Sequence, residues 1–191
     1  MIKLLDIAKY FLGKGEIPAD GILADFTMGN GNDTLFLCSL VPEGMVYAFD
    51  IQPEAVENTR KRLSVNGVEN AELILDSHAN AGKYIKTPIH GGMFNLGYRP
   101  GGDKNVHTMH ESTLKAVETA MELLAPGAVL VVSVYPGHSE GKTEGEMLTE
   151  KLARCDKKEY NVAVYRLINA EDSPFIIAIQ KNKLKNTGGN T

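Results

Sequence analysis

Short apolar runs alternate with amphipathic segments along most of the chain. The apolar runs predict strands over residues 22–27, 45–49, 72–75, 91–96, 128–134, 160–168 and 175–180. Apolar residues at helical spacing predict helices over residues 1–12, 34–40, 53–66, 79–85, 108–124 and 141–155. The run at 128–134 is apolar throughout, which is typical of a strand that is buried on both faces of a sheet.

Strands that alternate with helices in this way indicate βαβ units and a parallel sheet. The last two predicted strands follow each other directly, which favours an antiparallel hairpin at the edge. We therefore predict one doubly wound α/β domain over residues 1–181, with a seven-stranded, mostly parallel sheet and helices on both faces. A flexible polar tail is expected over residues 182–191. In such folds, ligands bind beyond the carboxyl ends of the strands.

The segment after the first predicted strand reads Asp25-Phe26-Thr27-Met28-Gly29-Asn30-Gly31-Asn32-Asp33-Thr34. Two glycines separated by one residue let the backbone turn tightly and approach a ligand closely. The dinucleotide-binding fingerprint has a third glycine where this chain has Thr34, and a larger residue there crowds a pyrophosphate. The segment therefore argues against NAD. The alternative is that Gly29 and Gly31 serve only a tight strand-to-helix turn.

Polar residues also follow the next two predicted strands. Asp50 ends the second strand, and an acidic residue about 20 positions beyond the glycines is placed to accept hydrogen bonds from ribose hydroxyls. Asp76-Ser77-His78 follows the third strand, where an adenine would lie. The alternative for Asp50, and for Asp76 or Ser77, is a helix cap.

These three strand ends indicate a cofactor that contains a nucleoside but no pyrophosphate. The pattern resembles the class I S-adenosylmethionine-dependent methyltransferases, which have a Rossmann-like fold. The resemblance implies that the loop after the first strand holds the methionine part, that Asp50 holds the ribose and that residues 76–78 face the adenine. The implied cofactor-binding residues are Asp25, Thr27, Gly29, Asn30, Gly31, Asn32, Asp33, Asp50, Ile51, Gln52, Asp76, Ser77, His78 and Asn95.

Two further motifs follow the fourth and fifth strands. Asn95-Leu96-Gly97-Tyr98 looks like a variant of a motif found in amino-methylating enzymes of this fold, and Tyr135-Pro136-Gly137-His138 follows the fifth strand. Together with the 25–34 segment, these motifs resemble the YtqB-type family. That family was first described as rRNA methylases and is now known as MnmM, the tRNA 5-aminomethyl-2-thiouridine methyltransferases. Arg99 departs from the pattern, because an apolar residue is expected there.

The resemblance implies N-methylation of the 5-aminomethyl group on uridine 34, in the anticodon loop of tRNA, to give 5-methylaminomethyl-2-thiouridine. Asn95 and Tyr98 are expected to orient the amine, and His138 or Asp33 to accept its proton. The expected RNA-binding residues are Tyr98, Arg99, Lys104, Tyr135 and His138. An rRNA or a small-molecule amine is the alternative acceptor for the same cofactor.

The net charge of −4 excludes a protein that coats nucleic acid nonspecifically, so RNA would bind through a local patch. The run Arg60-Lys61-Arg62 indicates a solvated helix face. Lysines 181, 183 and 185 are candidates for additional phosphate contacts. A homodimer would widen the RNA footprint, because the sequence predicts no separate RNA-binding domain.

The two cysteines, Cys38 and Cys155, are too few for a disulfide framework and indicate a reducing compartment. Cys38 falls within a helical pattern and is expected in the core. His107 and His110 have no further ligands nearby that would complete a zinc site, so we expect no metal. No apolar run approaches the length of a membrane span, and the first residues do not resemble a signal peptide. The expected location is the cytoplasm.

Two function classes remain as alternatives to a methyltransferase. An oxidoreductase using NAD would share the fold, and Thr34 speaks against it. A noncatalytic RNA-binding or protein-binding module would keep the fold and function without a cofactor.

Overall fold

The computed structural model describes residues 3–96, 110–137, 139–170 and 172–183. A seven-stranded sheet has the strand order β3-β2-β1-β4-β5-β7-β6. Its strands are β1 (Ile22–Asp25), β2 (Met45–Asp50), β3 (Ala71–Leu75), β4 (Ile89–Leu96), β5 (Leu124–Val134), β6 (Tyr160–Tyr165) and β7 (Phe175–Lys181). The first five strands run parallel, and β7 is antiparallel to both β5 and β6. The predicted fold class, including the closing hairpin, is confirmed.

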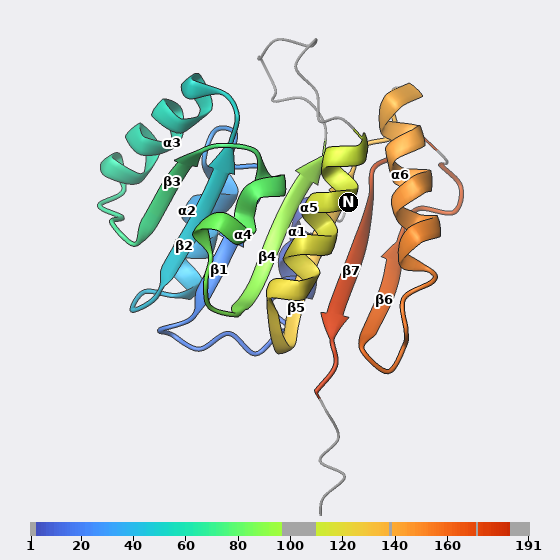
Figure 1. The fold of residues 1–191 in the computed structure, drawn as a ribbon. Coiled ribbons are helices and arrows are strands. Elements are labelled where there is room, and N and C mark those ends of the chain that lie inside the picture. Colours follow the sequence, from blue (N-terminus) through green and yellow to red (C-terminus); the bar gives the residue numbers. More distant parts are fainter. Residues whose placement is uncertain (1–2, 97–109, 138, 171, 184–191) are drawn as a thin grey trace, which may run out of the picture.

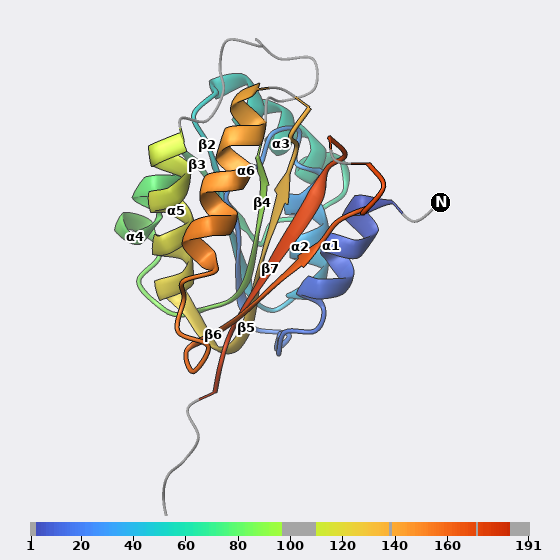
Figure 2. The same cartoon turned by 90° about the vertical axis from the view of Figure 1, so that its right-hand side faces the viewer.

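Helices cover both faces of this sheet (Figures 1 and 2). The described helices are α1 (Leu4–Leu12), α2 (Asn32–Leu40), α3 (Pro53–Val65), η1 (His78–Asn80), α4 (Ala81–Tyr84), α5 (His110–Leu123) and α6 (Ser139–Leu152). Figure 2 shows α4, α5 and α6 on one side of the sheet and α1, α2 and α3 on the other. The molecule is therefore a three-layer sandwich.

Each face of the sheet has its own apolar core. On the α4–α6 side, the rings of Phe26 and Phe94 stack with their centroids 4.3 Å apart. On the α1–α3 side, Leu23, Met93 and Val131 are buried against helix residues. Because side chains alternate between the faces of a strand, neighbouring residues at a strand end belong to different layers. Packing in both cores therefore fixes the position of each strand end, and with it the start of the loop that follows.

Each strand differs from its predicted bounds by at least one residue, and the differences are largest at the start of β5 and at the end of β6. β5 begins at Leu124, earlier than the predicted 128, because Leu124 pairs with Ile89 before the register shifts at Gly91. β6 ends at Tyr165 rather than continuing to residue 168. In the same register Leu167 would face Pro174, which has no N–H to donate to the ladder.

The sheet reverses its strand order between β1 and β4, which lie side by side in the centre. The carboxyl ends of β1, β2 and β4 therefore meet at one edge, at the top of Figure 1. This topological switch point is where doubly wound folds bind ligands. Among the described residues, no helix is long and apolar enough to cross a membrane.

Candidate functional site

The loop between β1 and α2 is held in place by α3. Thr59 Oγ1 donates a hydrogen bond to the backbone oxygen of Gly29 over 3.2 Å. Arg62 Nε donates to the backbone oxygen of Asn30 over 2.6 Å. Gly31 has a φ of +76°, and a Cβ atom there would lie 2.8 Å from two side-chain atoms of Thr59. Gly31 is therefore required both by the turn and by the close approach of α3.

The amide groups of this loop are already used within the protein. Four backbone N–H groups donate to protein acceptors, those of Thr27, Met28, Gly29 and Gly31. The N–H of Gly29 donates to the carboxylate of Asp50 over 3.0 Å. Loops that cradle a phosphate point such groups at the ligand. These four N–H groups are therefore not free to point at a phosphate in this conformation of the loop.

Asp25 is a buried carboxylate at the end of β1. It is 1% exposed, and it accepts a hydrogen bond from Thr34 Oγ1 over 2.6 Å. Burial, followed by the nearby charge of Asp33, raises the pKa of Asp25 to about 7, and the charge of Asp50 contributes in the same direction. Thr34 thus supports this carboxylate at the position where a dinucleotide-binding loop has its third glycine.

Asp33 and Asn95 face each other across the site. Asn95 Nδ2 donates a short hydrogen bond to Asp33 Oδ2, and the backbone N–H of Asn95 donates to Thr27 Oγ1 over 2.7 Å. Burial raises the pKa of Asp33, while the charge of Lys9 and the bond from Asn95 lower it. Burial and the charge of Asp33 raise the pKa of Tyr135, which follows β5. The first, fourth and fifth strand ends therefore meet around Asp33.

Asp50 ends β2, and His78 lies in the turn that follows β3. His78 Nδ1 is 3.0 Å from the backbone oxygen of Phe26. A carbonyl oxygen only accepts, so Nδ1 carries the proton and Nε2 is left as an acceptor. Burial lowers the pKa of His78, so the ring is neutral at pH 7. Asp50 accepts from the backbone N–H of Gln52 over 2.9 Å as well as from Gly29.

Asp76 and Ser77 organise the turn after β3. Ser77 Oγ accepts from the backbone N–H of Ala79 over 3.3 Å, so the helix-cap interpretation of Ser77 is confirmed. Asp76 accepts hydrogen bonds from the backbone N–H of Ser77 and from the side chains of Asn80 and Tyr84. The bonds from Asn80 and Tyr84 hold the pKa of Asp76 below its usual range.

Four predicted site residues lie outside the described residues, namely Tyr98, Arg99, Lys104 and His138. The tail residue Lys185, a predicted phosphate contact, also lies outside them. Of the predicted cofactor residues, Ile51 is 55% exposed and points its side chain to solvent. The two described tail lysines lie at the far end of the sheet. Lys183 pairs with Glu16 over 2.6 Å, and Lys181 donates to the backbone oxygen of Glu122. These two lysines do not extend the site.

Sequence reasoning missed the partners that hold the site together. Arg60 and Lys61 are exposed and form ion pairs with Glu57, which agrees with the prediction of a solvated helix face. Arg62 is different, because it is half-buried and holds the loop at Asn30. Lys9 Nζ lies 4.5 Å from the ring centroid of Phe36, one turn along α2 from Asp33. No sequence pattern links such distant positions.

The family model described as "Putative rRNA methylase" matches residues 46–181 of the chain. The chain belongs to this family. The family resemblance carried by residues 25–34, 95–98 and 135–138 is thus confirmed. The matched range includes β2 through β7, and so it includes most of the strand ends described above.

Other members show how far the similarity extends. The chain is 32% identical over 171 residues to "tRNA (mnm(5)s(2)U34)-methyltransferase, chloroplastic" of Arabidopsis thaliana. That match covers 83% of this chain but only 62% of the relative's length. A "putative rRNA-methylase" of Clostridium thermocellum is 39% identical, with a TM-score of 0.89, and the match covers 95% of this chain and 99% of that one. A "putative methyltransferase" of Streptococcus mutans, solved in complex with SAH, is 35% identical with a TM-score of 0.86 and the same coverage.

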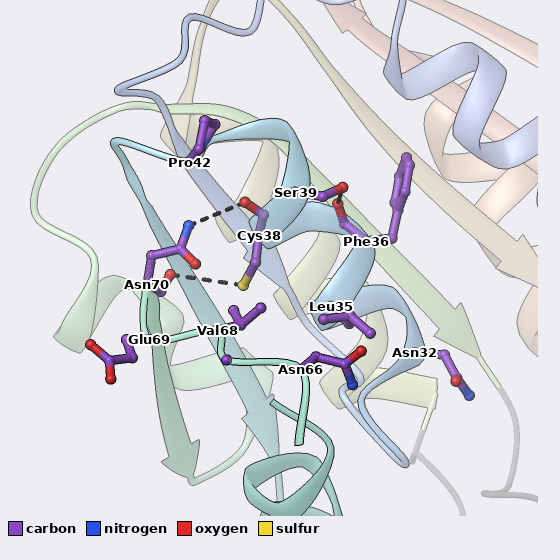
Figure 3. A pocket seen from close by; sticks show the side chains of 11 residues that line it. Asn32, Leu35, Phe36, Cys38, Ser39, Pro42, Asn66, Val68, Glu69 and Asn70 are labelled. Atoms are coloured by element: carbon purple, nitrogen blue, oxygen red, sulfur yellow. Dashed lines mark hydrogen bonds between the residues drawn. The ribbon is translucent and has the colours of Figure 1, made fainter. Parts of the chain in front are cut away.

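A hollow lies between α2 and the segment that joins α3 to β3, and Asn32, which directly follows the loop after β1, is one of its lining residues (Figure 3). Asn70 Nδ2 donates there to the backbone oxygens of Cys38 and Val41, which end α2. Cys38 is 2% exposed, and burial raises the pKa of its thiol to about 11. The prediction that Cys38 is a core residue is confirmed. Its backbone oxygen accepts from Asn70 near the end of α2.

Replacing Lys9 with methionine is expected to raise the pKa of Asp33 further, because the positive charge that favours the ionised carboxylate is lost. An NMR titration that follows the carboxyl carbon of Asp33 measures this effect. Lys14→Met is the matched control, since Lys14 Nζ lies over the ring of Tyr10, away from Phe36. An unchanged titration in Lys9→Met would contradict a role for α1 in the charge of the site.

Proposed function

We propose that this chain transfers the methyl group of S-adenosylmethionine to the 5-aminomethyl group of uridine 34 in tRNA. The observation that carries the proposal is the cluster of three carboxylates, Asp25, Asp33 and Asp50, beside a loop whose amides are already engaged. Such a site favours a cationic ligand over a phosphate. The name of the Arabidopsis relative and the SAH in the Streptococcus mutans structure support the acceptor and the cofactor respectively.

The residues present fit this cofactor. Its sulfonium and ammonium charges suit the carboxylates near the end of β1, since opposite charges nearby favour the ionised forms. Asp50, held by the backbone of Gly29 and Gln52, is placed to accept hydrogen bonds from the ribose hydroxyls. His78 Nε2 is an acceptor for the amino group of the adenine. When bound, the cofactor supplies a methyl group on a positively charged sulfur.

The acceptor amine must be neutral to react. If its pKa resembles that of lysine, about 10.4, deprotonation at pH 7 costs about 4–5 kcal/mol. A partly desolvated site lowers this cost, because burial disfavours the charged amine. Asp33 is placed to accept an N–H group of the amine and to aim its lone pair at the methyl carbon, and Asn95 helps to orient the amine by holding this carboxylate. The bound cofactor would supply the methyl group to the amine and would be left as a neutral thioether, and Asp33 would accept the proton that the amine gives up.

The partners follow from the same proposal. An anticodon loop presents unstacked bases, which proteins bind by stacking and by hydrogen bonds to base edges. Tyr135, half-buried beside Asp33, is the described aromatic residue in position for such a contact. Electrostatic contact with RNA would make binding weaken steeply with salt. A homodimer would provide a wider surface for the tRNA.

The proposal is tested by incubating the protein with labelled S-adenosylmethionine and total RNA from cells that lack this enzyme. Label in tRNA, recovered as 5-methylaminomethyl-2-thiouridine by mass spectrometry of nucleosides, is the expected result. Asn95→Ala is expected to lose transfer, and its protection from thermal unfolding by S-adenosylhomocysteine measures how much Asn95 also contributes to cofactor binding. Label in rRNA or in a small amine would overturn the proposed acceptor. Protection by NADH instead of S-adenosylhomocysteine would overturn the proposed cofactor.

A further inference from the structure

Asn95 has a polar neighbour on the adjacent strand. Asn95 of β4 and Ser133 of β5 are direct partners in the parallel register. Two residues earlier, Met93 and Val131 are also partners, and both are buried in the core on the α1–α3 side. Side chains alternate along a strand, so Asn95 and Ser133 project from this same face. Ser133 is 0% exposed.

Both side chains have a buried oxygen that lacks a hydrogen-bond partner among the described residues, namely Asn95 Oδ1 and Ser133 Oγ. The other polar groups of Asn95 are satisfied, because Nδ2 donates to Asp33 and the backbone N–H donates to Thr27. Leaving a buried polar group unpaired costs about 1–3 kcal/mol. A carbonyl oxygen needs a donor, and a serine hydroxyl is one. Each of the two atoms therefore supplies what the other lacks.

The separation of the strands suits such a pairing. Neighbouring strands lie about 4.8 Å apart, and the two oxygens do not bond to each other directly, so the contact between these same-face partners requires a bridging water. A buried water requires polar groups on at least two sides, and these two oxygens meet that requirement.

We propose that Ser133 is a positioning residue, whose hydroxyl donates through one buried water to Asn95 Oδ1 and secures the carbonyl half of the amide. Asp33 accepts from the amino half of this amide, and Ser133 secures the carbonyl half. If the amide turned over, its carbonyl would face the carboxylate of Asp33, and its amino group would face Ser133. Asp33, which only accepts, thus selects the orientation, and the contact with Ser133 anchors the carbonyl half in that orientation. Ser133 is fully buried, so it acts on the acceptor only through Asn95.

The direct test follows the side-chain NH₂ group of Asn95 by NMR, with its signal assigned from its absence in Asn95→Asp. In Ser133→Ala, we expect exchange of these protons with solvent to accelerate about tenfold, as expected for the loss of one hydrogen bond. Ser133→Thr keeps the hydroxyl and is expected to retain slow exchange. Val131→Ala is the matched control, because it removes buried side-chain volume from the same face of β5 and no polar atom.

The kinetic readout rests on the proposed function. Ser133→Ala is expected to lower kcat for tRNA methylation about tenfold, with KM for tRNA and the affinity for S-adenosylhomocysteine within twofold of wild type. Val131→Ala is expected to lower Tm and to keep kcat within twofold. Unchanged NH₂ exchange in Ser133→Ala, or equal effects of Ser133→Ala and Val131→Ala, would overturn the positioning role. If the exchange responds as expected and tRNA accepts no methyl group, the proposed function fails and the positioning role stands.

Discussion

Replacing Asp50 with alanine is expected to weaken binding of S-adenosylhomocysteine about a hundredfold. The carboxylate of Asp50 accepts from the backbone N–H of Gly29 and from that of Gln52, and so it joins the loop after β1 to the start of α3. In the proposed function it also accepts from the ribose hydroxyls. Hydrogen bonds to a charged group contribute about 1.5–3 kcal/mol each. The loss of two of them corresponds to at least the stated decrease, since about 1.4 kcal/mol is a tenfold change.

Isothermal titration calorimetry of Asp50→Ala and Asp50→Asn measures this effect. Asp50→Asn keeps one acceptor oxygen and is expected to have an intermediate affinity. Glu72→Ala is a suitable control, because Glu72 is an exposed carboxylate on β3 with no described contact to the loop. Wild-type affinity in Asp50→Ala would mean that Asp50 only supports the turn, and the ribose assignment would be wrong.

Gly31→Ala is expected to lower both the free energy of unfolding and the affinity for the cofactor. A non-glycine residue in the left-handed region costs about 1–3 kcal/mol. The new Cβ would also lie 2.8 Å from Thr59 Cγ2 and Thr59 Oγ1, so that the loop or α3 has to move. Because the loop is held by α3, we expect the displacement to weaken binding of S-adenosylhomocysteine by more than tenfold.

Two variants separate the strain of the backbone from the contact with Thr59. Gly67→Ala introduces the same kind of strain, at φ +65°, in a place where a Cβ would meet nothing within 4 Å. Gly67→Ala is expected to lower the free energy of unfolding and to leave the affinity for the cofactor unchanged. The double variant Gly31→Ala/Thr59→Ala removes both obstructing atoms and is expected to regain part of the cofactor affinity. Chemical denaturation and calorimetry on all four proteins, with Thr59→Ala included, give the comparison. Equal losses in Gly31→Ala and in the double variant would rule out the contact as the cause.

Much of the fold was predictable, because its signals are local. The alternation of apolar runs and amphipathic segments gave every strand from β1 to β7 and the direction of the last hairpin. Asp25, Asp50 and Asn95 were identified because each one ends a strand, and parallel strands bring such ends to one edge. The start of β5 at Leu124 was missed, because it depends on pairing with Ile89 across the sheet.

The supporting contacts of the site were not predictable, because they join elements that are distant in sequence. Arg62 was assigned to a solvated face together with Arg60, but its guanidinium reaches the loop at Asn30. Ser133 occupies an apolar strand, and its relation to Asn95 follows only from the register of β4 and β5. Lys9 of α1 likewise affects the pKa of Asp33 on α2, a relation that no local sequence pattern indicates.

The support that α3 gives to the loop after β1 has a consequence for the order in which substrates bind. Thr59 and Arg62 hold the loop through its carbonyl groups, and Asp50 holds it through an amide. A loop fixed in this way loses little conformational entropy when a ligand binds. In the proposed reaction, the acceptor then does not have to arrive first in order to shape this loop for the cofactor.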